Sequence, residues 1–155
     1  MSKIKVRTAT VDDTAALCRI STEDLGYKCD EALVRKRIEE LDHRREEVFI
    51  AEIDGECAGY IHVDVFKTLY MEDMVNYLGV AVSSKFRRMG VGSAIIAAAE
   101  EWALGKGIYK VRLDSGEKRT GAHKFYEKLG YENDKMQKHF IKTLARDAVS
   151  LHSFV

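Results

Sequence analysis

The chain has 155 residues, the length of one ordinary domain, and 46% of them are hydrophobic and 32% charged. Because 25 basic residues balance 25 acidic ones in a chain of this hydrophobicity, the composition excludes an intrinsically disordered protein. The sequence has no proline, which excludes cis-proline turns and proline-rich linkers and leaves the sharp turns to its 11 glycines and to Asn or Asp.

The zero net charge conceals a difference between the two halves of the chain. Residues 1–75 carry 11 basic and 17 acidic side chains, whereas residues 76–155 carry 14 and 8. One interpretation is an uneven scatter of solvated charge. The other is an anion-binding surface in the second half and a surface that attracts cations in the first half.

The three cysteines and five histidines follow no metal-binding pattern. No two cysteines have Cys-x-x-Cys spacing and no two histidines form a His-Glu-x-x-His pair. An odd number of isolated cysteines fits reduced thiols, so we expect a cytoplasmic protein with no disulfide framework and no metal site. The first residues show no signal peptide, and no apolar run approaches the ~20 residues of a membrane helix, so we expect no membrane partner.

The first half of the chain predicts three strands and two helices. Thr10 and Asp13 form a capping-box pattern at a helix start, and Asp54-Gly55 between two apolar runs is typical of a hairpin. In chain order, the predicted elements are a strand at 3–8, helices at 10–25 and 31–45, and strands at 48–53 and 56–66.

The second half predicts strands that alternate with helices. They are a strand at 76–82, a helix at 92–106, a strand at 110–114, a helix at 120–129 and a closing strand at 138–144. This alternation, combined with the antiparallel hairpin, predicts an α/β fold with a mixed sheet in one domain over residues 1–144. Apolar side chains in the tail, residues 145–155, indicate either a contact in a homodimer or a frayed end.

The segment Arg87-Arg88-Met89-Gly90-Val91-Gly92 stands between a predicted strand and a predicted helix. Two glycines at this spacing let the backbone turn tightly, and the free N–H groups of the helix start then face whatever is bound there. Such a turn suits a phosphate or pyrophosphate, and the two arginines add positive charge. Neither the Walker A pattern nor the dinucleotide G-x-G-x-x-G pattern fits, which leaves the pattern [R/Q]-x-x-G-x-G.

This strand, loop and helix resemble the most recognisable segment of the GCN5-related N-acetyltransferase (GNAT) superfamily. A second segment, Ala122-His-Lys-Phe-Tyr126-Glu-Lys-Leu-Gly130-Tyr131, is similar to the family's A-x-x-[LF]-Y-E-K-x-G-[FY]. The two segments are separated by one predicted helix and one predicted strand, as in the family. The resemblance covers residues 76–131 closely, and the predicted element order of the whole chain agrees with a GNAT-type splayed sheet flanked by helices.

The resemblance implies acetyl-CoA as the acetyl donor. Backbone groups of Val80, Ala81 and Val82 would pair with the pantetheine arm like an added strand. The pyrophosphate would be held by the loop and helix start, formed by Arg87, Arg88, Met89, Gly90, Val91, Gly92 and Ser93. In the family the sheet splays to admit the thioester, often beside a bulge, and Gly79 marks either such a bulge or a close packing contact.

The resemblance also implies a general acid at Tyr126, because the departing CoA thiolate needs a proton. Arg119 stands where the family often has an asparagine that contacts the cofactor, so here we expect an arginine to reach a phosphate. A protonated acceptor amine also needs a base. Three alternatives are open: Asp114 at the end of a predicted strand, Glu72 or its neighbour Asp73 acting through water, or a relay of solvent alone.

The function predicted from these segments is transfer of an acetyl group from acetyl-CoA to a primary amine. Direct attack is expected because no cysteine stands in a nucleophile motif. Residues 23–47 and 72–73 contain many carboxylates, so a cationic small-molecule or peptide amine, held by the first two helices and the loop 67–73, is the expected acceptor. The alternative function is a catalytically silent acyl-CoA-binding regulatory module. A nucleic-acid partner is not expected, since no RNP1 or helix-turn-helix pattern is present.

Overall fold

Residues 3–146 are described by the structure, a computed structural model. The chain divides into two units, one up to Gly116 and one from Glu117 onward, and each is described by itself. The first unit holds the sheet and three of the helices, whereas the second unit holds helix α4. Within the described residues, no helix is long and apolar enough to cross a membrane.

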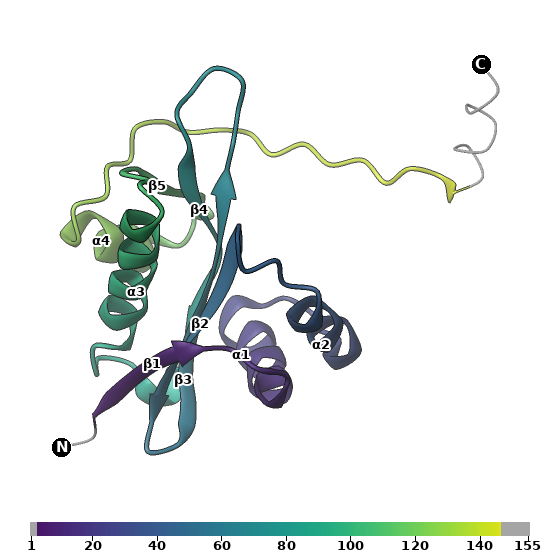
Figure 1. The fold of residues 1–155 in the computed structure, drawn as a ribbon, viewed down its shortest axis with the longest axis vertical. Helices are drawn as coiled ribbons and strands as arrows, with labels where there is room; N and C mark the ends of the chain where they lie inside the picture. The colour runs from purple at the N-terminus through teal and green to yellow at the C-terminus, as the bar shows by residue number, and fades with distance from the viewer. Residues whose placement is uncertain (1–2, 147–155) are drawn as a thin grey trace. The chain divides into compact units, whose positions relative to one another are not determined.

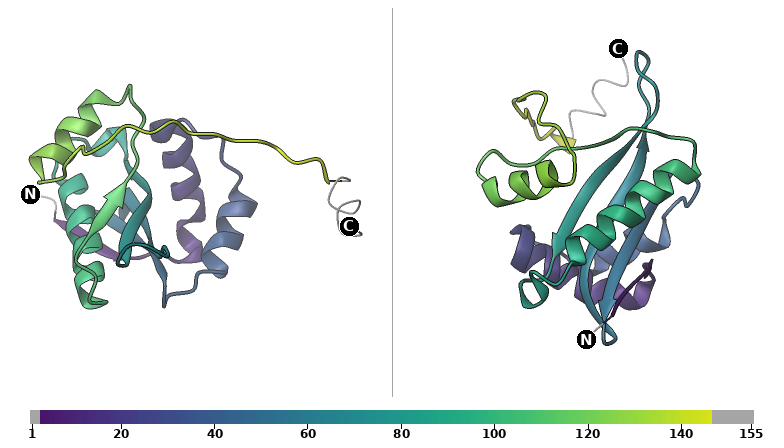
Figure 2. Two further views of the ribbon diagram at one scale, coloured as in Figure 1. Left: turned by 90° about the horizontal axis from the view of Figure 1, so that it is seen from above. Right: turned by 90° about the vertical axis from the view of Figure 1, so that its left-hand side faces the viewer.

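The first unit is built on one mixed sheet with the strand order β1-β2-β3-β4-β5. Strands β1 to β4 pair antiparallel with their neighbours, and β5 pairs parallel with β4. Figures 1 and 2 show α3 lying along one face of the sheet and α1 and α2 covering the other. The bounds are β1 Ile4–Thr8, α1 Thr14–Leu25, α2 Glu31–Glu39, β2 Glu46–Ile53, β3 Glu56–Phe66, β4 Met74–Val82, α3 Val91–Gly105 and β5 Val111–Leu113. The prediction of an α/β fold with a mixed sheet is confirmed.

The alternation of side chains in β3 separates two layers of core. Ile61 and Val63 are fully buried, whereas Tyr60 faces α1, where its hydroxyl lies 2.7 Å from that of Ser21. Gly59, the residue before Tyr60, allows β3, β4 and α3 to approach one another closely. A Cβ at this position would lie 2.7 Å from the carbonyl oxygen of Ala81 in β4 and 2.9 Å from Cγ1 of the first residue of α3.

Two local predictions are confirmed by the geometry of the turns. The hydroxyl of Thr10 accepts from the backbone N–H of Asp12, and the backbone N–H of Thr10 donates to the carboxylate of Asp13 at 2.8 Å. This capping box begins a short 3-10 turn, Val11–Asp13, that leads into α1. Asp54 and Gly55 both have positive φ, 51° and 77°, as a two-residue hairpin turn requires.

The second helix is shorter than the predicted range 31–45. Asp30 caps its start as expected, but α2 ends at Glu39 and β2 already begins at Glu46. The cause is a turn at Asp42, whose carboxylate accepts from the backbone N–H and the guanidinium of Arg44. Aspartate side chains compete in this way with the helical pattern of the backbone.

The predicted closing strand at Lys138–Leu144 is wrong. This segment has no regular secondary structure, and both Phe140 and Ile141 are more than four-fifths exposed. A strand is stable only when another strand pairs with it, and no described strand pairs with this segment. The tail, residues 145–155, for which the sequence leaves both a dimer contact and a frayed end open, lies almost wholly outside the described residues.

The second unit contains α4, Thr120–Lys128, close to the predicted range. The helix ends at Leu129, and Gly130 follows it with φ 94°. The ring of Tyr126 packs against its neighbour Phe125, with 5.4 Å between centroids, and against Tyr131, with 5.8 Å. These ring contacts hold Tyr126 in place within the unit.

Candidate active site

The loop between β4 and α3 turns through two residues with left-handed backbone conformation. Arg88 has φ 64° and Gly90 has φ 85°. Glycine adopts this conformation freely, whereas an arginine does so at a cost of roughly 1 kcal/mol or more. A strained residue in such a place is typical of a site that requires one particular backbone path.

The N-terminus of α3 has free hydrogen-bond donors. No side chain caps it, and its first turn carries no acidic residue. The first intrahelical hydrogen bond is donated by Ala94 to the carbonyl of Gly90 at 3.1 Å, so the N–H groups of residues 91–93 have no acceptor within the helix. Free donors at the positive end of the helix dipole suit an anion such as a pyrophosphate.

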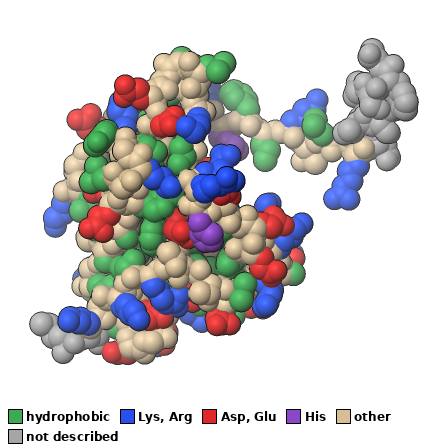
Figure 3. Space-filling view, viewed as in Figure 1, with side chains coloured by type: hydrophobic (Ala, Val, Ile, Leu, Met, Phe, Trp, Pro, Cys, Tyr) green, Lys and Arg blue, Asp and Glu red, His purple; other side chains and the backbone are tan. Residues whose placement is uncertain are grey.

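Basic side chains surround this loop, and two of them already face carboxylates. Lys85 donates to Glu56 at 3.0 Å, and the guanidinium of Arg87 lies 3.9 Å from the buried carboxylate of Asp24. Arg88 is exposed and forms no ion pair with a described residue. Figure 3 shows Lys and Arg interspersed with Asp and Glu over the visible face, so charge of one sign does not dominate there.

Strand β4 is paired on its outer side along only part of its length. β5 pairs with it at Val75, Asn76 and Tyr77, whereas β4 continues to Val82. β5 ends at Leu113, the partner of Tyr77, so beyond Tyr77 the backbone groups of β4 on this side have no strand partner among the described residues. An extended ligand with amide groups can add to such an edge as a further strand.

A bulge lies where this pairing ends. On the other side of β4, Val63 pairs with Tyr77 and His62 pairs with Gly79, which leaves Leu78 as the extra residue. A side chain added at Gly79 would make ordinary contact with the ring of Tyr60, 3.5 Å away. The bulge expected near Gly79 is therefore present, and close packing does not explain the glycine.

Asp114 follows β5 directly, one position after Leu113, the partner of Tyr77. Both of its carboxylate oxygens accept from the guanidinium of Arg112 at 3.0 Å, and the same guanidinium donates to the side-chain oxygen of Asn76. The side chain of Asp114 remains 78% exposed. The ion pair orients this carboxylate without removing it from solvent.

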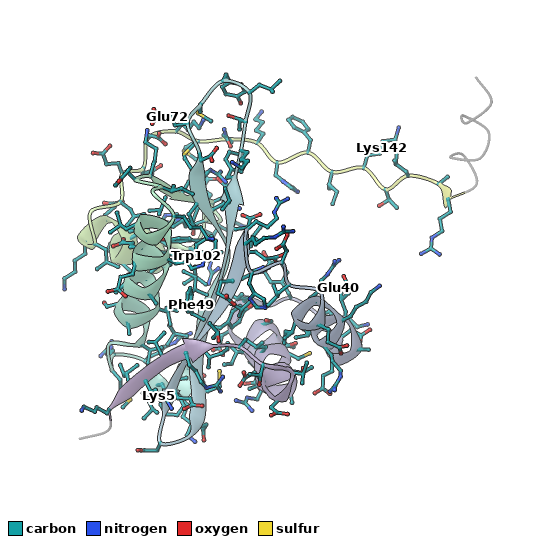
Figure 4. All side chains as sticks on the ribbon, viewed as in Figure 1. Lys5, Glu40, Phe49, Glu72, Trp102 and Lys142 are labelled. Atoms are coloured by element: carbon teal, nitrogen blue, oxygen red, sulfur yellow. The ribbon has the colours of Figure 1, made fainter. Side chains whose placement is uncertain are left out.

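Glu72 lies in the loop between β3 and β4, two positions before β4 begins (Figure 4). It lines a hollow of about 320 Å³ together with Tyr109 and Lys110, and its neighbour Asp73 accepts from Lys67 at 2.6 Å. Gly79 is seven positions after Glu72, roughly 20 Å of extended chain. The structure does not bring Glu72 to the bulge.

Tyr126 and Arg119 belong to the second unit. Arg119 is the residue immediately before α4, and Tyr126 lies in its last turn. Burial raises the pKa of the Tyr126 phenol, and the positive charge of Arg119 lowers it by a smaller amount. The phenol therefore stays protonated at neutral pH, as a proton donor must.

Another cavity of the first unit, about 460 Å³, lies between α1, α2 and the sheet. Its wall is mainly apolar, with Leu17, Val34, Ile38 and Tyr60 among the lining residues. The polar lining includes two carboxylates, Glu40 and Glu46, one guanidinium, Arg37, and the imidazole of His62. Figure 4 labels Glu40 at the end of α2, well away from Glu72.

Sequence reasoning did not find His62 and Glu46. The imidazole Nε2 of His62 lies 2.9 Å from a carboxylate oxygen of Glu46, a contact between β3 and β2 over 16 positions of sequence. Asp64 lies on the same face of β3, directly opposite Glu46 in the register, and one of its carboxylate oxygens is buried without a hydrogen-bond partner. The only sequence signal was the alternation that places Tyr60, His62 and Asp64 on one face of a strand.

Comparison with known proteins agrees with this arrangement. The model of the acetyltransferase (GNAT) family matches residues 14–131. An N-alpha-acetyltransferase of Sulfurisphaera tokodaii is 30% identical over 115 residues, which are 66% of this chain and 66% of that protein. An uncharacterized N-acetyltransferase of Methanocaldococcus jannaschii is 28% identical over 100 residues, 63% of this chain and 44% of that protein. The chain thus spans less than two thirds of the length of these two relatives.

A solved structure supports the fold. The aminoglycoside acetyltransferase AAC(6')-Iy, in complex with the bisubstrate analogue CoA-S-monomethyl-acetylneamine, has a TM-score of 0.78 to this chain. Sequence identity is 21%, and the match covers 92% of this chain and 100% of that one. The likeness shows that the two chains share a fold.

Proposed function

Because the chain belongs to the acetyltransferase (GNAT) family, we propose that it transfers an acetyl group from acetyl-CoA to a primary amine, by direct attack of the amine on the thioester. One observation carries the proposal. The uncapped N-terminus of α3 lies directly after β4, whose outer backbone groups lose their strand partner beyond Tyr77. These are the two features that a ligand with a pyrophosphate at one end and amide groups along its arm requires.

The residues present fit acetyl-CoA. The pyrophosphate would accept from the free N–H groups of α3, and Arg88 would add positive charge. The pantetheine arm would run along β4 from Val82 toward Gly79 and so bring the thioester to the bulge. Arg119 of the second unit is proposed to contact a phosphate, on the strength of its place before the Tyr126 motif.

Two proton transfers accompany the reaction. Tyr126 is proposed to give a proton to the departing sulfur, which its raised pKa supports because the phenol is protonated at neutral pH. Asp114 remains a proposed acceptor for the proton of the amine, since it directly follows the residue that pairs with Tyr77. Glu72 is a weaker proposal because of its distance along the strand from the bulge.

The cavity between α1, α2 and the sheet is the proposed acceptor site. Its apolar wall and its two carboxylates against one guanidinium favour a small-molecule or peptide amine with a positive charge and some apolar surface. A cytoplasmic location is also proposed, from the odd number of isolated cysteines in the sequence.

A direct test measures release of free CoA thiol from acetyl-CoA in the presence of a panel of primary amines, with the acetylated product identified by mass spectrometry. We expect turnover of at least one cationic amine. Calorimetry should show that CoA binds to the protein in the absence of any amine. If CoA binds but no amine in the panel is acetylated, the protein is instead a silent acyl-CoA-binding module. If CoA does not bind, both functions are wrong.

A further inference from the structure

We infer that His62 is the base that removes the proton from the acceptor amine, and that Glu46 positions its imidazole. This inference rests on the proposed acetyl transfer and names a residue that the sequence did not suggest. It follows from the place of His62 in the sheet, from its hydrogen bond and from the cavity into which the pair is built.

The place of His62 is set by strand register. His62 pairs with Gly79 at the bulge of β4, where the outer edge of that strand becomes free. Opposed residues of antiparallel strands lie about 4.5–5.5 Å apart at Cα. A thioester carried along the outer edge of β4 would lie about two strand spacings, roughly 10 Å, from the backbone of His62, a gap that the imidazole and the acceptor amine would fill.

The hydrogen bond with Glu46 determines which nitrogen is basic. An ionised carboxylate only accepts, so Nε2 carries the proton and donates to Glu46 at 2.9 Å. The other nitrogen, Nδ1, then holds a free lone pair, and no described residue hydrogen-bonds to it. The carboxylate also stabilises the imidazolium that forms when Nδ1 takes a proton.

The cavity brings an amine to this lone pair. His62 and Glu46 both line it, and their side chains are 31% and 27% exposed, so the ring is accessible to an acceptor and to the solvent that finally receives the proton. The charged groups that face His62 are Glu46 on β2, Asp64 on its own strand, and Arg37 and Glu40 on α2.

The proposed step is balanced. The ammonium nitrogen gives one proton to Nδ1 of His62, and its freed lone pair forms the bond to the acetyl carbon. The carbon–sulfur bond breaks, the sulfur leaves with the electron pair and takes up one proton, and the new amide loses its second proton to solvent. His62 then releases its proton to solvent, so the products are an amide, a free thiol and one proton.

A base is needed only for an amine that is protonated, and this gives a selective test. Wild type and His62→Gln are compared with propylamine, which is protonated at pH 7, and with methoxyamine, which is already neutral there. We expect His62→Gln to lower kcat/KM for propylamine by about 100-fold or more and to leave that for methoxyamine within about threefold. In this variant only the neutral fraction of propylamine should react, so its rate should rise with pH up to the pKa of the amine, whereas the wild-type rate should level off at lower pH.

The chain supplies a matched control. His43 forms a similar contact with Glu47, 3.0 Å from its Nδ1, but its side chain is 63% exposed and it does not line the cavity. His43→Gln should leave kcat/KM for both amines, and the pH profile for propylamine, unchanged. Glu46→Gln keeps a hydrogen-bond acceptor for the imidazole but removes the charge, and it should lower kcat/KM for propylamine by about 10-fold. This variant tests the proposal if His62→Gln does not fold. CoA binding should be unchanged in every variant.

The outcomes separate the two proposals. The role of His62 is overturned if wild type is active and His62→Gln keeps its kcat/KM for both amines, or loses it equally for both. The proposed acetyl transfer would then stand. Selective loss of propylamine in Asp114→Asn but not in His62→Gln would assign the base to Asp114 instead. A wild type that acetylates neither of these amines nor any amine of the panel overturns the proposed function, and the role of His62 with it.

Discussion

Arg7 and Asp13 are joined by two parallel hydrogen bonds, at 2.7 and 2.8 Å, between the guanidinium and both oxygens of the carboxylate. Arg7 lies in β1, and Asp13 lies in the turn that begins α1, so the pair connects the first strand of the sheet to the first helix. The side chain of Asp13 is only 8% exposed, and Glu52 of β2 accepts from the same guanidinium.

Asp13→Asn should destabilise the protein by about 2 kcal/mol, because it removes the charge of a bidentate pair that is largely buried. Arg7 lowers the pKa of Asp13 in the folded state, so the stabilisation is present above the ordinary aspartate pKa near 4 and is lost as pH falls through the lower folded value. Urea unfolding at pH 7 and pH 2.5 measures this. Asp12→Asn, an exposed neighbour, should change the free energy of unfolding little at either pH, and an equal effect of both variants would contradict the prediction.

Gly90→Ala tests the backbone path of the loop between β4 and α3, the proposed site of the pyrophosphate. With φ at 85°, alanine should cost roughly 1 kcal/mol of stability, and any shift of the loop to relieve this strain also moves the free N–H groups of α3. We expect CoA affinity to fall about 10-fold by calorimetry. Gly105→Ala is the control, since a Cβ there meets open space at an ordinary φ, and it should leave affinity unchanged.

Tyr126→Phe removes the proposed proton donor and keeps the ring. We expect kcat to fall by about 100-fold or more while CoA affinity stays the same. Because the pKa of the phenol is raised, the alkaline limb of the wild-type pH profile should lie above the ordinary tyrosine value near 10. Tyr131→Phe, which alters the ring packed beside it, should change kcat less than threefold. Equal kcat in wild type and Tyr126→Phe would remove this tyrosine from the mechanism.

Gly59→Ala tests the close approach of β3, β4 and α3. A Cβ at 2.7 Å from the carbonyl oxygen of Ala81 cannot be accommodated unless backbone moves, and we expect a loss of about 3 kcal/mol in the free energy of unfolding. Since Ala81 lies in the proposed CoA-binding segment of β4, CoA affinity should fall as well. Gly121→Ala, where a Cβ meets open space, should not destabilise the protein.

The elements that sequence predicted well are those with local causes. The capping box at Thr10, the hairpin turn at Asp54 and the glycine loop before α3 each depend on residues within a few positions of one another. Their physical signals, a side chain that accepts from the backbone or a residue that tolerates positive φ, are written into the sequence itself. The mixed sheet followed from the order of these elements.

The features that sequence missed depend on partners far along the chain. The apolar residues of 138–144 have the composition of a strand, but no partner strand is available among the described residues. The contact between His62 and Glu46 depends on the register of β2 and β3, and the free edge of β4 depends on where β5 ends. As carboxylates near predicted strand ends, Asp114 and Glu72 were both candidate bases. Only the fold shows that Asp114 lies near the bulge and that Glu72 lies in a distant loop.

The outer edge of β4 beyond Tyr77 affects how the protein behaves without the proposed ligand, CoA. An unpaired strand edge is a template on which other chains can pair and aggregate, and proteins with such edges usually blunt them with charge or cover them. The edge residues Leu78–Val82 carry no charge, so a bound pantetheine arm would serve as their cover. Solubility would then depend on the supply of CoA, and dilute, CoA-stripped protein should scatter less light over time once CoA is returned.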